Sequence, residues 1–535
     1  MISKRRKLDP VEAFRRLSRR GFSTRSNAEP LSLRSRLILG ILTVQIIFLG
    51  WSIGGVRAGT VVPFFGLAMM GVCLLFVPLG RVNALQESAH GPRQYQRQLL
   101  RWPFFWCALL CLGYIFVQNL NPAWEYRLSQ DGKVFRLFPI EHIAWLPTGV
   151  VAPFEKMNGW RQLLIYASAV GMLVLIWCGG RRRRHLIYLL WVSVLSTTTM
   201  VIVGLIQRLT EATHVLWVTK ITHPLFFGTF TYKNHAGAFI FLNLAIALAL
   251  AVYYFRVSRR RNSKSSPHGF LLLNAMLMAV GVFYTDSRGA MLILAGFCVC
   301  SLLLFLLEFL KTRSEHSNLW AGVVFACGAL GFGWFLSTFI DFDKVEGRLN
   351  VLLDDVQQLD QGNPDASSVS TKMRYFIYTA TIEMIKDRPV FGWGAGIYRY
   401  YFPVYQVRYP DIHYTDWIGW GRDPKTGKSI KMPHRTYHLI NNAHNDGLQF
   451  LAEYGVVGVG LMLAAVLSLI LPAITRLRRM RLWMWVMVVG LVGTVVHSCV
   501  DFVFQSPSII YLWLGVVAIL VKYLKLSKRY EVRQS

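Results

Sequence analysis

A polar segment that leads into a long apolar run contains the side chain best suited to proton transfer. Residues 441–447 read Asn-Asn-Ala-His-Asn-Asp-Gly and precede that run. The imidazole of a histidine such as His444 has an ordinary pKa of about 6.5, so it can take a proton from a hydroxyl near neutrality. The alternative is an interfacial histidine with one structural hydrogen bond. Spacing alone leaves this choice open, because His413, His434 and His438 lie in the same loop.

Two arginines stand where a cation could bind a phosphate. Arg288 lies in an Asp-Ser-Arg-Gly turn at 286–289 between two apolar runs, and Arg374 begins an amphipathic segment. A guanidinium forms bidentate, charge-assisted hydrogen bonds with phosphate oxygens. The alternative for Arg288 is pairing with Asp286 inside the turn. The alternative for Arg374 is a side chain that extends along the membrane interface.

A further polar group lies near the end of a later apolar run. His497 and Asp501 are four residues apart there. Polar residues close to membrane segments tend to be functional or paired with each other. We predict a structural pair between these two side chains, with a functional role as the alternative.

These residues must be positioned by a membrane-embedded scaffold. Hydrophobic residues make up 54% of the 535 residues. About 20 consecutive apolar residues cross a bilayer as a helix. The sequence therefore predicts an all-α polytopic membrane protein with about twelve transmembrane helices, at 37–56, 60–80, 102–120, 160–179, 186–206, 234–255, 269–285, 290–310, 319–340, 451–475, 482–500 and 508–524.

The charge pattern predicts how these helices are oriented. The chain has 58 Lys and Arg against 28 Asp and Glu, a formal net charge of +30. Every short basic run falls on one predicted side, which the positive-inside rule assigns to the cytoplasm. We therefore expect both termini to be cytoplasmic, and we interpret the basic surplus as a topology signal that also favours anionic membrane lipids. This distribution argues against binding to nucleic acid.

One predicted outer loop has the size of a domain. It covers 341–450 and contains a helical stripe from Met373 to Ile385 that we expect to form an amphipathic helix ending before Pro389. We therefore divide the chain into a basic cytoplasmic tail, helices 1–9, a large periplasmic loop, helices 10–12 and a cytoplasmic tail, at 1–36, 37–340, 341–450, 451–524 and 525–535. No zinc-like grouping of Cys and His occurs in the sequence, and we expect neither metal nor cofactor.

The order of several motifs resembles the O-antigen ligase and polymerase family of bacterial inner membranes. The motifs are the Ser-Arg-Gly turn, Arg374 before an amphipathic run, Asp-Arg-Pro-Val-Phe-Gly-Trp-Gly at 387–394, Ala-His-Asn at 443–445, Leu-Gln at 448–449 and Glu-Tyr-Gly-Val-Val-Gly at 453–458. The resemblance covers roughly 190–520. A stretch at 411–432 departs from it as an apparent insertion that could reshape acceptor choice.

The resemblance implies a GT-C-like fold and a glycan transfer at the periplasmic face of the inner membrane. The donor would be a glycan on undecaprenyl diphosphate. Lipid A-core would be the acceptor of a ligase, and the alternatives are a growing polysaccharide or a protein. Transferred by motif, His444 would be the catalytic base and Arg288 and Arg374 would bind the diphosphate. Supporting positions would be Asn445, Gln449, Glu453, His497 and Asp501.

The chemistry of the residues agrees with that role. Displacing a diphosphate from an anomeric carbon needs a base for the acceptor proton and positive charge for the leaving group. Arginines can provide that charge, so we expect a metal-independent enzyme, and a single displacement would invert the anomeric centre. A transporter for lipid-linked saccharides is the alternative of another class, and it predicts ionisable groups near the middle of the membrane.

Overall fold

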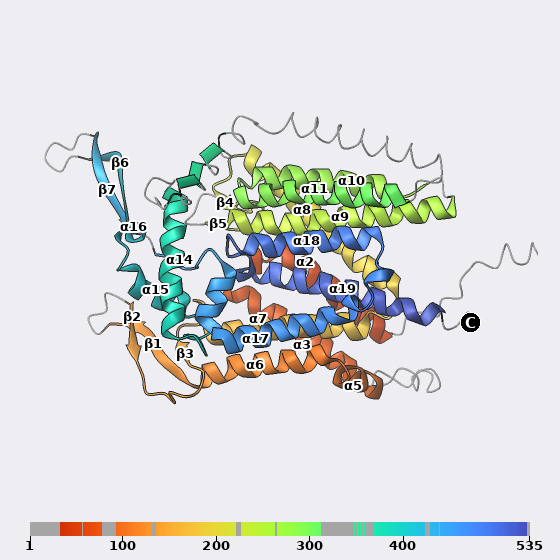
Figure 1. The fold of residues 1–535 in the computed structure, drawn as a ribbon, viewed down its shortest axis with the longest axis horizontal. Helices are drawn as coiled ribbons and strands as arrows, with labels where there is room; N and C mark the ends of the chain where they lie inside the picture. Colours follow the sequence, from red (N-terminus) through yellow and green to blue (C-terminus); the bar gives the residue numbers. More distant parts are fainter. Residues whose placement is uncertain are drawn as a thin grey trace, which may run out of the picture.

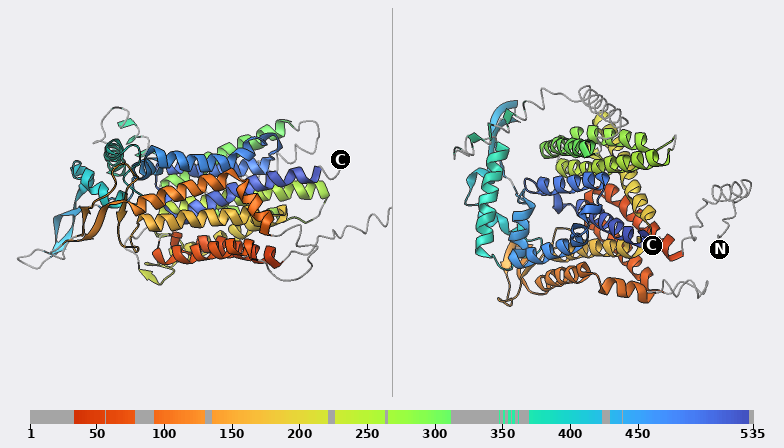
Figure 2. Two further views of the ribbon diagram at one scale, coloured as in Figure 1. Left: turned by 90° about the horizontal axis from the view of Figure 1, so that it is seen from below. Right: turned by 45° about the vertical axis from the view of Figure 1, so that its right-hand side comes forward.

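The structure is a computed structural model. It describes residues 33–55, 57–77, 92–129, 135–220, 226–262, 265–311, 369–422, 429–437 and 439–531, with isolated residues between 347 and 361. Long helices lie side by side, and the strands gather at one end of them together with helices that follow residue 368, whereas α5 (Pro92–Leu100) lies at the other end (Figure 1). We call the end with the strands the capped end. Helix α19 (Pro507–Glu531) ends toward the opposite end, and two further views agree with this arrangement (Figure 2).

Within the described ranges, nine helices are long and apolar enough to cross a membrane. They are α2 (Leu33–Trp51), α3 (Ala58–Phe76), α6 (Pro103–Leu120), α7 (Gly159–Gly179), α8 (Arg183–Leu209), α9 (Lys233–Arg261), α11 (Arg288–Lys311), α17 (Asp446–Ile474) and α19 (Pro507–Glu531). Two shorter apolar helices, α10 (His268–Tyr284) and α18 (Leu482–Ser498), coincide with two more predicted spans. The predicted span at 319–340 lies outside the described residues. The chain is a multi-pass membrane protein, and the count of twelve stays a prediction.

Helix α9 is one of the most buried long helices among the described residues because its small residues allow close packing. Its first half is rich in Ala and Gly, and most of it is buried. A Cβ at Gly490 of α18 would come within 2.4 Å of the Ala245 Cβ of α9. Small residues at such crossings let two helix backbones approach. This packing brings the start of α9 beside the end of α18.

The amphipathic helix predicted in the large loop is present as α14 (Val369–Asp387). The predicted stripe faces inward, with Ile377, Ala380 and Met384 fully buried. The short helices α15 (Tyr398–Gln406) and α16 (Pro410–His413) follow it, and the cluster of buried aromatic residues in α15 packs against α14. At the capped end, α14 thus carries Arg374 across the start of α17.

A backbone break in α17 attaches this cap to the bundle. Gly455 has φ 61°, a left-handed conformation that interrupts the helix. The freed N–H groups of Val456 and Val457 donate to the carbonyls of Pro389 and Val390. A Cβ at Gly455 would lie 2.3 Å from the Val390 carbonyl oxygen, so only glycine fits. The first two turns of α17 are thereby fixed to the segment that follows α14.

The prediction of an all-α fold was wrong in one respect, because the described residues include three small sheets. The first has the order β2-β1-β3, from β1 (Pro122–Leu128), β2 (Phe135–Pro139) and β3 (Gly149–Val151), and two hairpins pair β4 (His214–Val215) with β5 (Thr219–Lys220) and β6 (Tyr414–Arg422) with β7 (Ser429–Tyr437). Segments outside the helices must still pair their backbone polar groups, and these do so as strands. The apparent insertion at 411–432 falls largely on the second hairpin.

Candidate active site

The backbone of His444, just before the start of α17, has an unusual conformation and is fixed by hydrogen bonds. Its φ of 52° is rare for a residue with a side chain. The Tyr378 hydroxyl of α14 donates to the His444 carbonyl at 2.8 Å. Next along the chain, the Asn445 side chain caps α17 by accepting from the Leu448 N–H at 3.0 Å, and its amide donates to the Cys499 carbonyl at 2.7 Å. The imidazole is therefore fixed relative to α14, α17 and α18.

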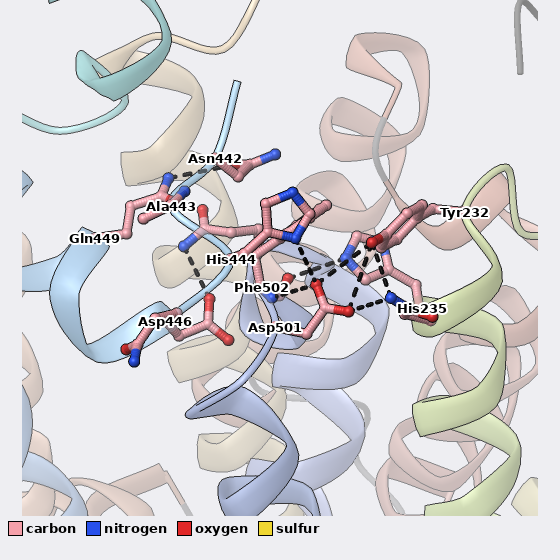
Figure 3. Close-up of polar contacts among 12 residues, drawn as sticks. Tyr232, His235, Asn442, Ala443, His444, Asp446, Gln449, Asp501 and Phe502 are labelled. Carbon is pink, nitrogen blue, oxygen red and sulfur yellow. Dashed lines mark hydrogen bonds and ion pairs between the residues drawn. The ribbon is translucent and has the colours of Figure 1, made fainter. Parts of the chain in front are cut away.

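The imidazole faces a buried carboxylate, that of Asp501 (Figure 3). His444 Nδ1 lies 3.4 Å from Asp501 Oδ1, and Asp501 is only 2% exposed. This separation is long for a hydrogen bond, but catalytic contacts commonly tighten when substrate binds. A carboxylate at Nδ1 favours the tautomer that leaves Nε2 without a proton. His444 is thus oriented as a base at Nε2.

Other donors hold Asp501 in its ionised form. It accepts from the Phe502 N–H at 2.8 Å, the Tyr232 hydroxyl at 3.4 Å and the amide of Asn234. Burial alone would raise the pKa of Asp501, but the contact with His444 and the charges of His444 and Arg374 together lower it to about 2. The carboxylate therefore remains charged across the range in which histidine titrates.

The side chains of Tyr232, His235 and His444 all contact Phe502. The Tyr232 ring stacks on it with centroids 4.8 Å apart, and the His444 ring meets it edge-on at 4.8 Å. His235 Nε2 lies 2.9 Å from the Phe502 carbonyl oxygen. These contacts join the first turn of α9 to the loop after α18. Together, Tyr232, Asn234, His235, His444, Asp501 and Phe502 form what we call the imidazole cluster.

The predicted structural pair of His497 and Asp501 was wrong. Helix α18 ends at Ser498, so the two residues do not share one helix face. Both ring nitrogens of His497 are buried without a hydrogen bond in the described part of the chain. The His497 ring packs instead on Gly289, where a Cβ would come within 2.6 Å of Nε2. His497 therefore places the start of α11 against the imidazole cluster.

The two candidate arginines lie on different elements near this cluster. Arg374 is half-buried on α14, and its charge contributes to the lowered pKa of Asp501. Arg288 is exposed at the first position of α11, directly before Gly289. The alternative pairing within the turn is not formed, because Asp286 pairs with Arg208 at 3.5 Å. Neither arginine has a hydrogen bond or ion pair among the described residues, so both guanidinium groups can accept an anion.

Gln449 and Glu453 form a separate structural group in the first turns of α17. Gln449 accepts from the Ala443 N–H at 3.1 Å and donates to Glu453 at 3.3 Å. Glu453, 1% exposed, also accepts from the Gly396 N–H at 3.2 Å. These bonds tie the segment before His444 to the segment before α15. Both residues thus hold the loop that carries His444.

Three residues lie outside the predicted site set, although the segment at 232–235 is interpreted from the sequence as either closing the site or anchoring the membrane interface. Tyr232 and Asn234 contact Asp501 from the start of α9, and Asp446 anchors α17 by accepting from the Phe504 N–H at 2.8 Å. Phe504 lies in the short helix η4 (Val503–Gln505) before α19. An acidic residue at the first position of a helix is a recognisable signal. No group of three or more His, Cys, Asp or Glu arranged to hold a metal occurs in the residues that the structure describes.

The fold and the site define a multi-pass membrane protein with a buried His–Asp pair at one end of its helices. Residues 273–416 match the family model described as O-antigen ligase, which confirms the resemblance drawn from the motifs. The match indicates an O-antigen ligase or polymerase type of function. The matched residues include Arg288 and Arg374 and end before His444. No curated protein matches the chain.

Proposed function

We propose that this protein transfers a glycan from an undecaprenyl-diphosphate carrier to an acceptor hydroxyl, with His444 as the base. The observation that carries the proposal is the contact between His444 Nδ1 and the buried carboxylate of Asp501. It supports a histidine that accepts a proton at Nε2 and is stabilised as an imidazolium. The family match independently supports glycan chemistry.

In the proposed reaction, His444 Nε2 takes the proton of the acceptor hydroxyl while that oxygen bonds to the anomeric carbon of the donor sugar. The bond from this carbon to the diphosphate oxygen breaks, and the electron pair leaves with the diphosphate. Arg288 and Arg374 offset the charge that develops there. A displacement of this kind inverts the anomeric centre and requires no metal. A positioned base contributes on the order of 10²–10⁴ in rate.

We further propose a GT-C type of helix bundle with twelve spans in a bacterial inner membrane. Both termini would be cytoplasmic, and the capped end would face the periplasm. Ligation to lipid A-core is the acceptor reaction that we place first, ahead of polysaccharide polymerisation and protein glycosylation. The transporter alternative has less support, because four buried ionisable groups, Asp446, Glu453, His497 and Asp501, gather at the capped end, and others such as Arg34, His185 and Lys522 lie toward the opposite ends of their helices.

The fate of glycans after deletion of the gene tests these assignments. Long polymer left on the carrier would support a ligase, single repeat units on the carrier a polymerase, and unglycosylated protein an oligosaccharyltransferase. Complementation with His444→Ala should reproduce the deletion phenotype. Unchanged glycans in the deletion strain, or loss of carrier-linked glycan from the outer leaflet, would contradict a transferase.

A further inference from the structure

A cavity of about 210 Å³ lies beside the imidazole cluster. Its wall includes three members of that cluster, Tyr232, His235 and Phe502. The rest of the wall comes from α7 and the residue Met157 before it, Thr231, the segment around α15, the start of α17 with the residues before it, and Gln505 of η4. Drug-sized ligands fill roughly 300–1,000 Å³, so this cavity has room for a much smaller group. It is therefore of the scale of one sugar ring next to the proposed base.

The lining of this cavity matches a ligand rich in hydroxyl groups. Each carboxamide offers both donors and an acceptor, which suits hydroxyls that act as either. Tyr232 and Phe502 add aromatic surface of the kind on which an apolar ring face packs. The carboxamides in the wall belong to Gln162, Asn441, Asn442, Gln449 and Gln505.

Charge makes this cavity a poor site for the diphosphate. Its wall carries the Glu453 carboxylate together with one cation, Arg399. Neither Arg288 nor Arg374 is among its lining residues. A dianionic group would meet only one cation and an acidic side chain in this wall, whereas a neutral ring needs no counter-charge. The cavity and the two arginines can thus bind different parts of one substrate pair.

Gln162 is the buried carboxamide in this wall that has no hydrogen-bond partner among the described residues. It lies in the first turn of α7 and is 94% buried, since 6% of it is exposed. Its carboxamide makes no hydrogen bond with any residue that the structure describes. Its amide atoms are not among the fully enclosed unpaired atoms of the described residues, so they open onto the cavity, where a ligand or solvent satisfies them. Gln449 and Glu453, in contrast, are already bonded to each other.

We propose that this cavity is a subsite for one sugar residue of the substrate, and that Gln162 is a specificity-determining contact to its hydroxyls. The assignment of that sugar to a transferred glycan rests on the proposed function. The presence of a sugar site does not rest on the proposed function, because binding can be measured without turnover. Gln162 lies outside the residues that match the family model.

Saturation-transfer NMR on the full-length protein in nanodiscs tests the site directly. The probes are free glucose, galactose, mannose, N-acetylglucosamine, heptose and glucuronate. We expect transfer to at least one of them, and binding about fivefold or more weaker in Gln162→Leu, the effect of one lost hydrogen bond. The matched control is Gln45→Leu, since Gln45 of α2 is also buried with both amide atoms unpaired and does not line the cavity.

No transfer to any probe with the wild type, or equal binding by both leucine variants, would overturn the proposal. If Gln162→Leu does not fold, Thr231→Val removes another lining hydroxyl with little change in shape and should weaken binding in the same direction. Equal binding by that variant would also count against the site.

A transfer assay then assigns the sugar to one substrate. If Gln162→Leu raises the KM for the acceptor and leaves the KM for the donor unchanged, the sugar belongs to the acceptor. The reverse pattern assigns it to the donor. A fall in kcat with both KM values unchanged would contradict a binding role. Absence of transfer by the wild type would refute the proposed function and leave the NMR result intact.

Discussion

Three buried carboxylates surround the start of α17, yet they have different partners. Asp501 faces an imidazole as well as neutral donors. Asp446 accepts from the Phe504 N–H and the Gln505 amide, and Glu453 accepts from the Gly396 N–H and the Gln449 amide. All three are no more than 2% exposed. Burial therefore does not distinguish the carboxylate that we propose to assist catalysis from those that hold the fold.

The partner of each carboxylate makes that distinction. Asp501 contacts the imidazole that we propose as the base, so its charge would stabilise the imidazolium formed in that step. The donors to Asp446 and Glu453 keep their protons, so these carboxylates fix backbone segments in place. Substitution of Asp501 should therefore mainly lower activity, whereas substitution of Asp446 or Glu453 should mainly lower stability.

The largest effect is expected from His444→Ala. Removing the base should lower the transfer rate about 10²–10⁴-fold and leave the melting temperature nearly unchanged. A radiolabelled or fluorescent lipid-linked donor would report the rate in purified protein. The exposed loop residue His142 provides a matched control, and His142→Ala should retain full activity. Activity retained by His444→Ala would remove that residue from the mechanism.

Asp501→Asn should rank next, with a loss of about 10–100-fold in kcat, as for other residues that orient a functional imidazole. Without the carboxylate charge, protonation of the imidazole becomes less favourable, so the acid limb of the pH–rate profile should move to lower pH. If Asp501 had only a structural role, Asp501→Asn would lower activity and leave the acid limb of the pH–rate profile at its wild-type pH.

Asp501 also makes a prediction about stability and pH. Because its pKa in the folded protein is lowered to about 2, its contribution is present above the ordinary pKa of aspartate, about 3.9, and is lost as the pH falls toward 2. Thermal unfolding of the wild type against Asp501→Asn from pH 7 to pH 3 measures this. The gap between them should narrow at the acidic end, and a constant gap would contradict the pairing.

Arg374→Lys should have a smaller effect, about tenfold on kcat. The ammonium keeps the charge but loses the planar fork that binds two phosphate oxygens. The matched control is Arg408→Lys, because Arg408 is exposed and pairs with Glu383 at 2.8 Å. Equal kinetics of the two variants would exclude a bidentate role for Arg374.

Asp446→Ala should affect stability far more than chemistry. It leaves the Phe504 N–H and the Gln505 amide without partners, which costs about 1–3 kcal/mol each for buried groups. The rate per folded molecule should stay within a few-fold of wild type. Glu125→Ala, which removes an exposed ion pair with Arg127, should cost less than about 1 kcal/mol. A large loss of kcat in Asp446→Ala would contradict the distinction between Asp501 and the two structural carboxylates, Asp446 and Glu453.

Much of the helical scaffold could be predicted because hydrophobicity is a local property. Runs of apolar residues located eleven of the predicted spans, each coinciding with a helix, and the stripe from Met373 to Ile385 located α14. The strands could not be predicted in the same way. β1 pairs with residues 135–139 and 149–151, and such pairing depends on partners rather than on local composition.

The site was only partly predictable for the same reason. His444 could be recognised as a titratable group beside a helix start. Its partner could not, because Asp501 is 57 residues further along the chain and spacing favoured His497 instead. Tyr232 and Asn234 come from the start of α9, more than 200 residues before His444. Only packing at the capped end brings these groups within reach of one carboxylate.

The sequence by itself determined a membrane-embedded helical protein, because apolar length and residue type follow directly from composition. It also determined which side chains are able to titrate or bind an anion. The tertiary structure decided which of them meet: His444 with Asp501, Gly289 with His497, and Gln162 with an open cavity. The physical reason is that a contact between distant segments depends on how helices pack, and the short end of α18 changed the partner that spacing predicted.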